Sequence, residues 1–142
     1  MDLKYNLEQT DQIAAQLVKK LANKTVWVFQ APMGAGKTTL IAAIGRALGI
    51  QQAMSSPTFS IMNEYEVQGK LVYHMDWYRL ENEAEARQAG VEAAMEEADL
   101  SLVEWPEKAP NLVPEHAVEI HIEIIDPDHR RIFIHHEKQP ME

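Results

Sequence analysis

Apolar and polar residues follow one another along the chain in two patterns, one typical of helices and one typical of strands. Over about residues 9–23 the apolar residues recur every three or four positions, which predicts an amphipathic helix. Residues 25–30 form an apolar run that predicts a buried parallel strand. Good helix formers follow from Leu40 to Leu48, and Gly49 is expected to end this second helix.

Strand patterns dominate the second half of the chain. Two strands are predicted on either side of a tight turn at Gln68-Gly69, and two short helices, divided by Gly90, are predicted within residues 81–98. A turn at residues 126–129 predicts a C-terminal hairpin. The strands outside residues 25–30 are expected at residues 3–5, 61–66, 70–75, 100–103, 118–124 and 130–134.

The connection between the buried strand and the second helix carries the most specific pattern. It reads Ala31-Pro32-Met33-Gly34-Ala35-Gly36-Lys37-Thr38-Thr39. Gly34 and Gly36 let backbone N–H groups and the helix N-terminus approach phosphates without obstruction by a Cβ atom. Lys37 is expected to reach the outer phosphates, and the hydroxyl of Thr38 is placed to hold the Mg²⁺ that bridges them. The stretch therefore predicts a phosphate-binding loop.

An ordinary strand–turn–helix connection is the alternative, because Gly-Lys-Thr occurs often by chance. Ala31 also stands where the eight-residue pattern begins with glycine, although alanine is small enough to keep the site narrow. The order of strand, loop and helix favours nucleotide binding. We therefore expect an α/β fold of the P-loop NTPase type, with three layers, a central mixed β-sheet flanked by helices, and a C-terminal antiparallel hairpin.

Chain length and composition further restrict the expected domain organisation, binding partners and location. At 142 residues the chain is long enough to bury a core, and we expect a single P-loop ATPase domain over residues 1–142. Acidic residues outnumber basic ones by 22 to 13, for a net charge of −9, so most of the surface is expected to repel nucleic acid. The chain has no cysteine, which excludes disulfides and fits a reducing compartment. No apolar stretch is long enough to cross a membrane and no signal peptide is recognisable, so we expect a cytoplasmic location.

Two carboxylates come at the ends of predicted strands. Ligands collect at this edge of such a sheet, so Asp76 is a candidate to hold a metal-bound water, with a turn or helix-cap role as an equal alternative. Glu104 is the better candidate for a general base or a metal ligand, because the end of a buried strand gives it fixed geometry and partial desolvation. Trp105 is either a packing residue or part of a surface that contacts a base or a partner.

Three other positions carry open alternatives. Thr10 lies at the start of the first predicted helix, where a threonine is most often an N-cap. Thr58 lies in a Ser- and Pro-containing segment that is either a surface turn or a segment that closes over the γ-phosphate, and its position slightly favours the second. His135-His136 is expected at the surface, because no other metal-type residue is spaced to complete a site.

Four motifs together resemble the TsaE (YjeE) family, small bacterial ATPases of tRNA threonylcarbamoyladenosine synthesis. They are Ala31–Thr39, Ser56-Pro57-Thr58-Phe59, His74-Met75-Asp76-Trp77-Tyr78-Arg79-Leu80 and Glu104-Trp105. Their order and approximate spacing are those of the family, and they cover roughly residues 10–105. The family usually has G-E/D-L-G-A-G-K-T at the loop, and leucine in place of Trp77. Neither difference touches a phosphate-contacting or metal-contacting position, and beyond Pro106 only the strand-rich character matches.

The resemblance implies roles for specific residues, with ATP and Mg²⁺ as the cofactors. The nucleotide-binding residues implied are Thr10, Gly34, Ala35, Gly36, Lys37, Thr38, Thr39 and Arg130. Thr38 and Glu104 are expected around Mg²⁺, while Asp76 supports the metal water or positions the attacking water. Lys37, Asp76 and Glu104 are thus the catalytic candidates, and Thr38, Glu104 and Asp76 the metal candidates. In the last hairpin turn Arg130 is preferred to Arg131.

The resemblance also implies partners and a pathway. The family acts with TsaB and TsaD, and TsaD carries out threonylcarbamoyl transfer to adenosine of ANN-decoding tRNAs. TsaE and its ATP hydrolysis permit repeated turnover. We therefore expect this chain to meet tRNA mainly through its partners, in agreement with its acidic composition.

A weak, partner-stimulated ATPase is the favoured function, because no arginine in the sequence is obviously an arginine finger. The alternative is a small-molecule kinase on the same scaffold. A kinase needs an acceptor pocket and usually an arginine-bearing lid, whereas residues 81–99 are mainly acidic and contain only Arg87. A GTPase-like switch is disfavoured, since the N-K-x-D motif is missing and Asn23-Lys24 is followed by Thr25-Val26.

Overall fold

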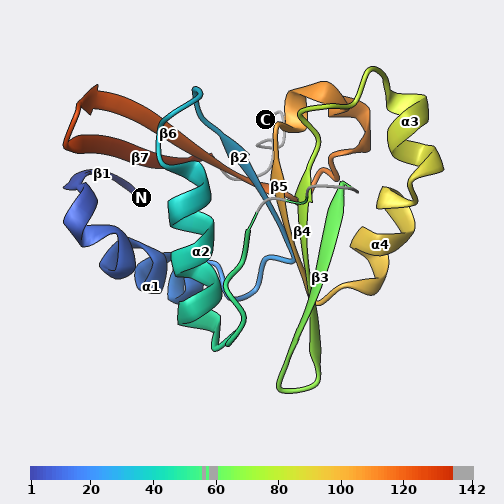
Figure 1. Cartoon of the computed structure of the whole chain (residues 1–142), viewed down its shortest axis with the longest axis horizontal. Coiled ribbons are helices and arrows are strands. Elements are labelled where there is room, and N and C mark those ends of the chain that lie inside the picture. Colours follow the sequence, from blue (N-terminus) through green and yellow to red (C-terminus); the bar gives the residue numbers. More distant parts are fainter. Residues whose placement is uncertain (56, 58–60, 136–142) are drawn as a thin grey trace, which may run out of the picture.

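The computed structural model describes residues 1–55, 57 and 61–135, and within these residues seven strands form one sheet (Figure 1). The strands are β1 (Asp2–Asn6), β2 (Val26–Gln30), β3 (Met62–Val67), β4 (Lys70–Asp76), β5 (Leu100–Glu104), β6 (Val118–Asp126) and β7 (His129–His135). The helices are α1 (Thr10–Lys20), α2 (Lys37–Leu48), α3 (Glu83–Gln88) and α4 (Val91–Glu97). Short 3-10 turns cover Leu7–Gln9, Pro106–Lys108 and Pro110–Leu112.

The sheet is mixed, with the order β1-β7-β6-β2-β5-β4-β3. Strands β6, β2, β5 and β4 run parallel to one another. At the two sides, β7 pairs antiparallel with β6 and β1, and β3 pairs antiparallel with β4. Strand β2 therefore lies at the centre of the parallel part, between β5 and β6. Its carboxyl end and those of β4 and β5 open onto the same edge of the sheet.

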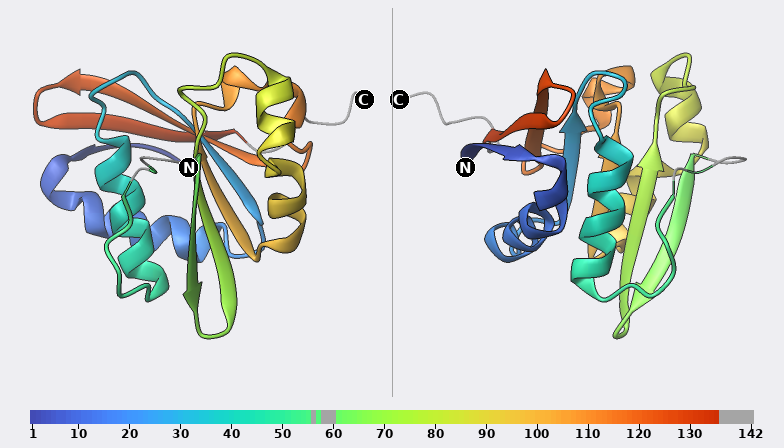
Figure 2. Two further views of the ribbon diagram at one scale, coloured as in Figure 1. Left: turned by 45° about the vertical axis from the view of Figure 1, so that its right-hand side comes forward. Right: turned by 60° about the vertical axis from the view of Figure 1, so that its left-hand side comes forward.

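Helices cover both faces of the sheet, so the fold has three layers. Figure 2 shows α1 and α2 on one side of the strands and α3 and α4 on the other. Alternate residues of β2 pack into the two cores: Trp27 and Phe29 lie with α1 and α2, whereas Val26 and Val28 lie with α3 and α4. Burial on both faces explains why this strand is a continuous apolar run instead of an alternating one.

The structure confirms the predicted α/β fold and most of its elements. The turn at Gln68-Gly69 has positive φ at both residues, as a tight hairpin turn requires, and Gly49 ends α2 with a φ of +94°. The first helix ends earlier than expected, at Lys20 instead of near residue 23, because the chain turns there through a bond from the amide of Lys24 to the carbonyl of Leu21.

The N-cap interpretation of Thr10 is wrong. The N-cap of α1 is Gln9, and Thr10 is the first helical residue. Its hydroxyl donates to the carbonyl of Leu7 at 2.7 Å, whereas a capping hydroxyl would accept a bond from a backbone N–H further along the helix. The preceding 3-10 turn supplies this carbonyl and so takes up the hydroxyl. Among the described residues, no helix has the length and apolar character needed to cross a membrane.

Candidate functional site

A cleft of about 710 Å³ opens at the carboxyl edge of the parallel strands. It lies between the connection from β2 to α2 and the segments that follow β4 and β5. Its lining includes Gly34, Gly36, Lys37, Thr38, Asp76 and Glu104. Distant parts of the sequence therefore meet here, as the predicted alignment of strand ends required.

The β2–α2 connection has the backbone shape of a loop that binds an anion. Gly34 and Gly36 have φ values of +83° and +90°, in the left-handed region that favours glycine. Helix α2 begins directly after Gly36, and its first turn contains no acidic residue. The free N–H groups and the positive end of the helix dipole thus face the cleft. Thr38 is exposed at this end, where its hydroxyl is accessible to a ligand.

Lys37 is buried although its side chain points into the cleft. Its ammonium lies 4.0 Å from Oε1 of Glu104 and 3.7 Å from the centroid of the Trp105 ring. Burial lowers the pKa of Lys37, and the negative charges of Glu104, Asp76 and Glu107 oppose that shift. Among the described residues the ammonium has no hydrogen-bond acceptor. A buried, unsatisfied donor of this kind fits an anionic ligand such as a phosphate group.

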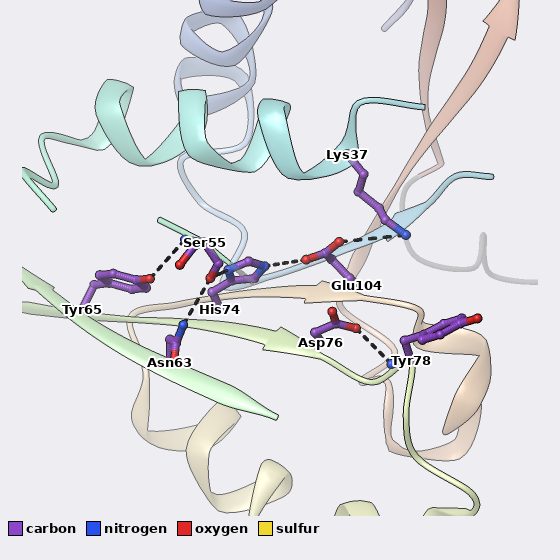
Figure 3. Close-up of polar contacts among 8 residues, drawn as sticks. All are labelled: Lys37, Ser55, Asn63, Tyr65, His74, Asp76, Tyr78 and Glu104. Carbon is purple, nitrogen blue, oxygen red and sulfur yellow. Dashed lines mark hydrogen bonds and ion pairs between the residues drawn. The ribbon is translucent and has the colours of Figure 1, made fainter. Parts of the chain in front are cut away.

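Glu104 is almost completely buried, with 2% of its surface exposed, at the last position of β5. Figure 3 shows its carboxylate between Lys37 on α2 and His74 on β4. Oε2 lies 2.7 Å from Nε2 of His74, while Oε1 faces the ammonium of Lys37. The expected burial of this carboxylate is confirmed, and its two oxygens face two different partners.

Asp76 ends β4 directly beside Glu104, its partner in the parallel β4–β5 register. It lines the cleft, and its Oδ1 also accepts a hydrogen bond of 3.0 Å from the backbone N–H of Tyr78. The turn role that the sequence left open for Asp76 is thus present in the structure, together with a place at the site. The second carboxylate oxygen and the neighbouring Glu104 give the cleft oxygen ligands of the kind that Mg²⁺ prefers.

Trp105 forms part of the cleft and is only half-buried. Its φ of +59° is uncommon for a bulky residue, and such conformations concentrate at functional sites. The ring contacts Lys37 on one side and lies 4.9 Å from the ring of Tyr78 on the other. Trp105 therefore packs against neighbouring side chains and also borders the cleft, and its contact with a base or a partner stays a prediction.

Three predicted nucleotide contacts, Thr10, Ala35 and Arg130, do not line this cleft among the described residues, and the side chain of Ala35 is buried. Arg130 is buried behind the loop, where its Nε donates to the carbonyl of Ala35 at 2.9 Å and its Nη1 to the carbonyl of Asp126 at 2.7 Å. Arg131 instead pairs with acidic residues on the sheet surface. Arg130 is thus the arginine that touches the loop, and contact of Thr10 or Arg130 with a nucleotide stays a prediction.

Sequence reasoning did not single out His74, Tyr78 or Arg79 as site residues. Tyr78 and Arg79 line the cleft, so an arginine of the chain does reach the site. His74 had a detectable signal, because residues two apart on a strand share a face and His74 precedes Asp76 by two positions on β4. Thr58, the predicted γ-phosphate residue, lies outside the described residues.

Among the described residues no group of three histidine and carboxylate side chains forms a ready metal site. Mg²⁺ commonly uses one or two protein oxygens and completes its shell with water and substrate phosphates. The Thr38 hydroxyl and the Asp76 and Glu104 carboxylates fit this mode of coordination.

His135 is exposed, as expected, and its ring lies 4.9 Å from that of His121, while His136 falls outside the described residues.

Fold and cleft together define an α/β protein of the P-loop NTPase type. The family model described as "Threonylcarbamoyl adenosine biosynthesis protein TsaE" matches residues 4–132. The chain therefore belongs to the TsaE family, as its motifs indicated.

Individual relatives agree with this assignment. A protein from Synechocystis sp. named tRNA threonylcarbamoyladenosine biosynthesis protein TsaE is 43% identical over 112 residues, which cover 75% of this chain and 70% of the relative. The protein of the same name from Haemophilus influenzae is 34% identical over 81% of this chain and 73% of its own length. A crystal structure of YdiB from Bacillus subtilis superposes with a TM-score of 0.74 and 26% identity, covering 97% of this chain and 87% of that one.

Proposed function

We propose that the chain binds ATP with Mg²⁺ in this cleft and hydrolyses it weakly alone and faster with TsaB and TsaD. In this role it would support threonylcarbamoyl modification of adenosine in ANN-decoding tRNAs. Membership of the TsaE family, whose names refer to threonylcarbamoyladenosine biosynthesis, supports the pathway. Beyond the pathway, we propose ATP as the nucleotide, Mg²⁺ as the metal, and TsaB and TsaD as the partners.

The observation that carries the proposal is the buried ammonium of Lys37. It stands at the start of α2 beside the loop, and among the described residues it lacks a hydrogen-bond acceptor. A β- or γ-phosphate oxygen would satisfy this donor and would also accept bonds from the loop amides. Neither an ordinary turn nor a packing role explains why a lysine is held in this position.

Different residues around the loop would bind the phosphates, hold the metal and act on the attacking water. In the proposed complex the amides of residues 34–39 and Lys37 bind the phosphates, and Thr38 holds the metal. When bound, Mg²⁺ neutralises charge on the transferred phosphoryl group. Glu104, at a fixed strand end, orients the attacking water or accepts its proton, and Asp76 supports a water of the metal shell.

Slow turnover of the isolated chain follows from the site. Phosphoryl transfer depends on positioning and on cations placed against the developing charge. Lys37 supplies one such cation from a buried position, whereas Arg79 lines the cleft as an exposed residue. An assembly with TsaB and TsaD would order the site, and the acidic chain, with its net charge of −9, would leave tRNA binding to these partners. We place this assembly in the cytoplasm.

A small-molecule kinase, the alternative, is disfavoured by the position of α3 and α4. Their apolar residues Ala86, Val91 and Met95 are buried against the sheet, so these helices form a layer of the fold and not a lid. The same segment contributes no residue of the cleft among the described residues.

Phosphate release tests the proposal directly. We expect slow release from ATP and Mg²⁺ by the chain alone and an increase of at least about tenfold with TsaB and TsaD. Calorimetry should show ATP binding and little heat with GTP. Vigorous turnover without partners, or ATP-dependent phosphorylation of a nucleoside or sugar, would count against the proposal. The control is Arg87→Ala, which changes an exposed residue far from the loop.

A further inference from the structure

His74 is completely buried on β4 and connects two parts of the chain that are distant in sequence (Figure 3). Its Nε2 lies 2.7 Å from Oε2 of Glu104 on β5, and its Nδ1 lies 3.1 Å from the carbonyl oxygen of Ser55 in the connection between α2 and β3. His74 does not itself line the cleft among the described residues. Of the two residues that it contacts, Glu104 lines the cleft and Ser55 does not.

The two contacts determine how the ring is held. A carbonyl oxygen only accepts hydrogen bonds, so Nδ1 carries a proton and donates it to Ser55. The 2.7 Å separation of Nε2 from Oε2 of Glu104 is also a hydrogen-bond distance. Both ring nitrogens are then engaged, and the ring cannot turn without losing one bond. In metal sites, partners of this kind orient the residues that act on the ligand.

Ser55 is itself held by neighbouring side chains. Asn63 donates to its carbonyl oxygen at 3.1 Å, and the hydroxyl of Tyr65 accepts from its amide at 3.4 Å. Both residues lie on β3, at the edge of the sheet next to β4. The carbonyl that fixes His74 is therefore part of the folded sheet edge.

The orientation of Glu104 has a consequence for Lys37. The ammonium of Lys37 lies 4.0 Å from Oε1, too far for a hydrogen bond. Because His74 holds Oε2, the carboxylate is kept from rotating and closing onto Lys37. If the two closed into a direct ion pair, Glu104 would no longer face the position of an attacking water.

We propose that His74 is a positioning residue for Glu104. It fixes one carboxylate oxygen so that the other stays directed at the phosphate side of the cleft. This inference rests on the proposed function, since it assigns His74 to the hydrolysis step and not to nucleotide binding. A packing role alone would predict a loss of stability without a selective loss of turnover.

Two substitutions separate the two contacts of the ring. The amide of glutamine occupies roughly the position of Nε2, and the amide of asparagine that of Nδ1. His74→Gln therefore keeps a donor for Glu104, whereas His74→Asn keeps only the donor for Ser55. With TsaB, TsaD, ATP and Mg²⁺, we expect kcat within about threefold of the wild type for His74→Gln and at least about tenfold lower for His74→Asn. ATP affinity by calorimetry should stay within about threefold for both.

Tyr65→Phe is the matched control, because it removes the contact to the amide of Ser55 and leaves both contacts of His74. Its kcat should stay within about twofold of the wild type. Equal losses of kcat in His74→Gln and His74→Asn overturn the inference, as does a loss in Tyr65→Phe as large as in His74→Asn. These results leave the proposed function intact, whereas a wild type that hydrolyses no ATP with its partners overturns both.

A spectroscopic readout covers the case in which His74→Asn does not fold. In protein labelled with ¹⁵N at histidine, Glu104→Gln should shift the Nε2 resonance of His74 much more than its Nδ1 resonance. Unchanged ring resonances show that the contact is not formed in solution and overturn the inference.

Discussion

The two walls of the cleft differ in how far apart in the sequence their residues lie. One wall, which we call the loop wall, consists of residues 34–39, which are contiguous in sequence and present main-chain N–H groups together with the side chains of Lys37 and Thr38. The other, the strand wall, consists of the side chains of Asp76, Glu104 and Trp105, with His74 behind Glu104. The loop wall depends on backbone shape and the strand wall on contacts between distant residues. We expect the loop wall to govern nucleotide affinity and the strand wall to govern turnover.

The largest expected effect is on the loop wall. Lys37→Ala removes the only buried ammonium of the cleft among the described residues, and we expect ATP affinity to fall by about a hundredfold or more. Calorimetry with ATP and Mg²⁺ measures this loss. Lys108, an exposed lysine whose ammonium lies 5.4 Å from the ring centroid of Tyr78, serves as a control, and Lys108→Ala should change the affinity by less than about threefold. Unchanged binding in Lys37→Ala would remove the basis of the proposed function.

The corresponding change in the strand wall is Glu104→Ala. Because Glu104 is expected to act on the attacking water, kcat should fall by about a hundredfold while ATP affinity changes little. Single-turnover phosphate release together with calorimetry separates the two quantities. If Glu104→Ala and Lys37→Ala lose binding equally, the two walls share one task and Glu104 is misassigned.

An intermediate effect is expected where a distant side chain supports the loop wall. Arg130→Ala removes the donor to the carbonyl of Ala35, and we expect a loss of roughly 1–3 kcal/mol in the free energy of unfolding together with weaker ATP binding. Urea unfolding and calorimetry measure both. Arg131→Ala is the control, since its exposed ion pairs are worth about 0–1 kcal/mol. A loss of affinity in Arg131→Ala that matches Arg130→Ala would show that charge, not the bond to the loop, is responsible.

The smallest effect concerns the free energy of unfolding, which is expected to be lowered by the burial of the Lys37 ammonium. Burial lowers the pKa of its ammonium, so between that lowered value and the ordinary value of about 10.4 the unfolded chain binds more protons than the folded protein. The stability of the wild type relative to Lys37→Met should therefore rise with pH through this window. At neutral pH, without nucleotide, Lys37→Met should be more stable by about 1 kcal/mol in urea unfolding. A less stable Lys37→Met protein would mean that Glu104 already satisfies the ammonium.

The contrast between the walls also explains what the sequence could predict. The loop wall was predictable because glycine, lysine and threonine in one short segment act through local backbone geometry. The strand ends were predictable because apolar runs stop at Asp76 and Glu104. The bond from His74 to Glu104 was not, because it depends on the pairing of β4 with β5, which local patterns do not fix. For Thr10, the cap prediction failed because a 3-10 turn precedes it, in which Oε1 of Gln9 accepts from the amide of Asn6, and the carbonyl of Leu7 in this turn takes the Thr10 hydroxyl.

The hydrogen bond from Arg130 on β7 to the carbonyl of Ala35 connects the C-terminal hairpin to the loop, although this hairpin carries no motif of its own. A shortened chain that kept every recognisable motif but ended before residue 130 would lose β7, which pairs with both β6 and β1, and with it the support behind the loop. Its phosphate-binding motif would be complete in sequence and unsupported in three dimensions. The part of the chain that shapes the cleft therefore extends well beyond the last motif, to the strand between β6 and the β1 edge of the sheet.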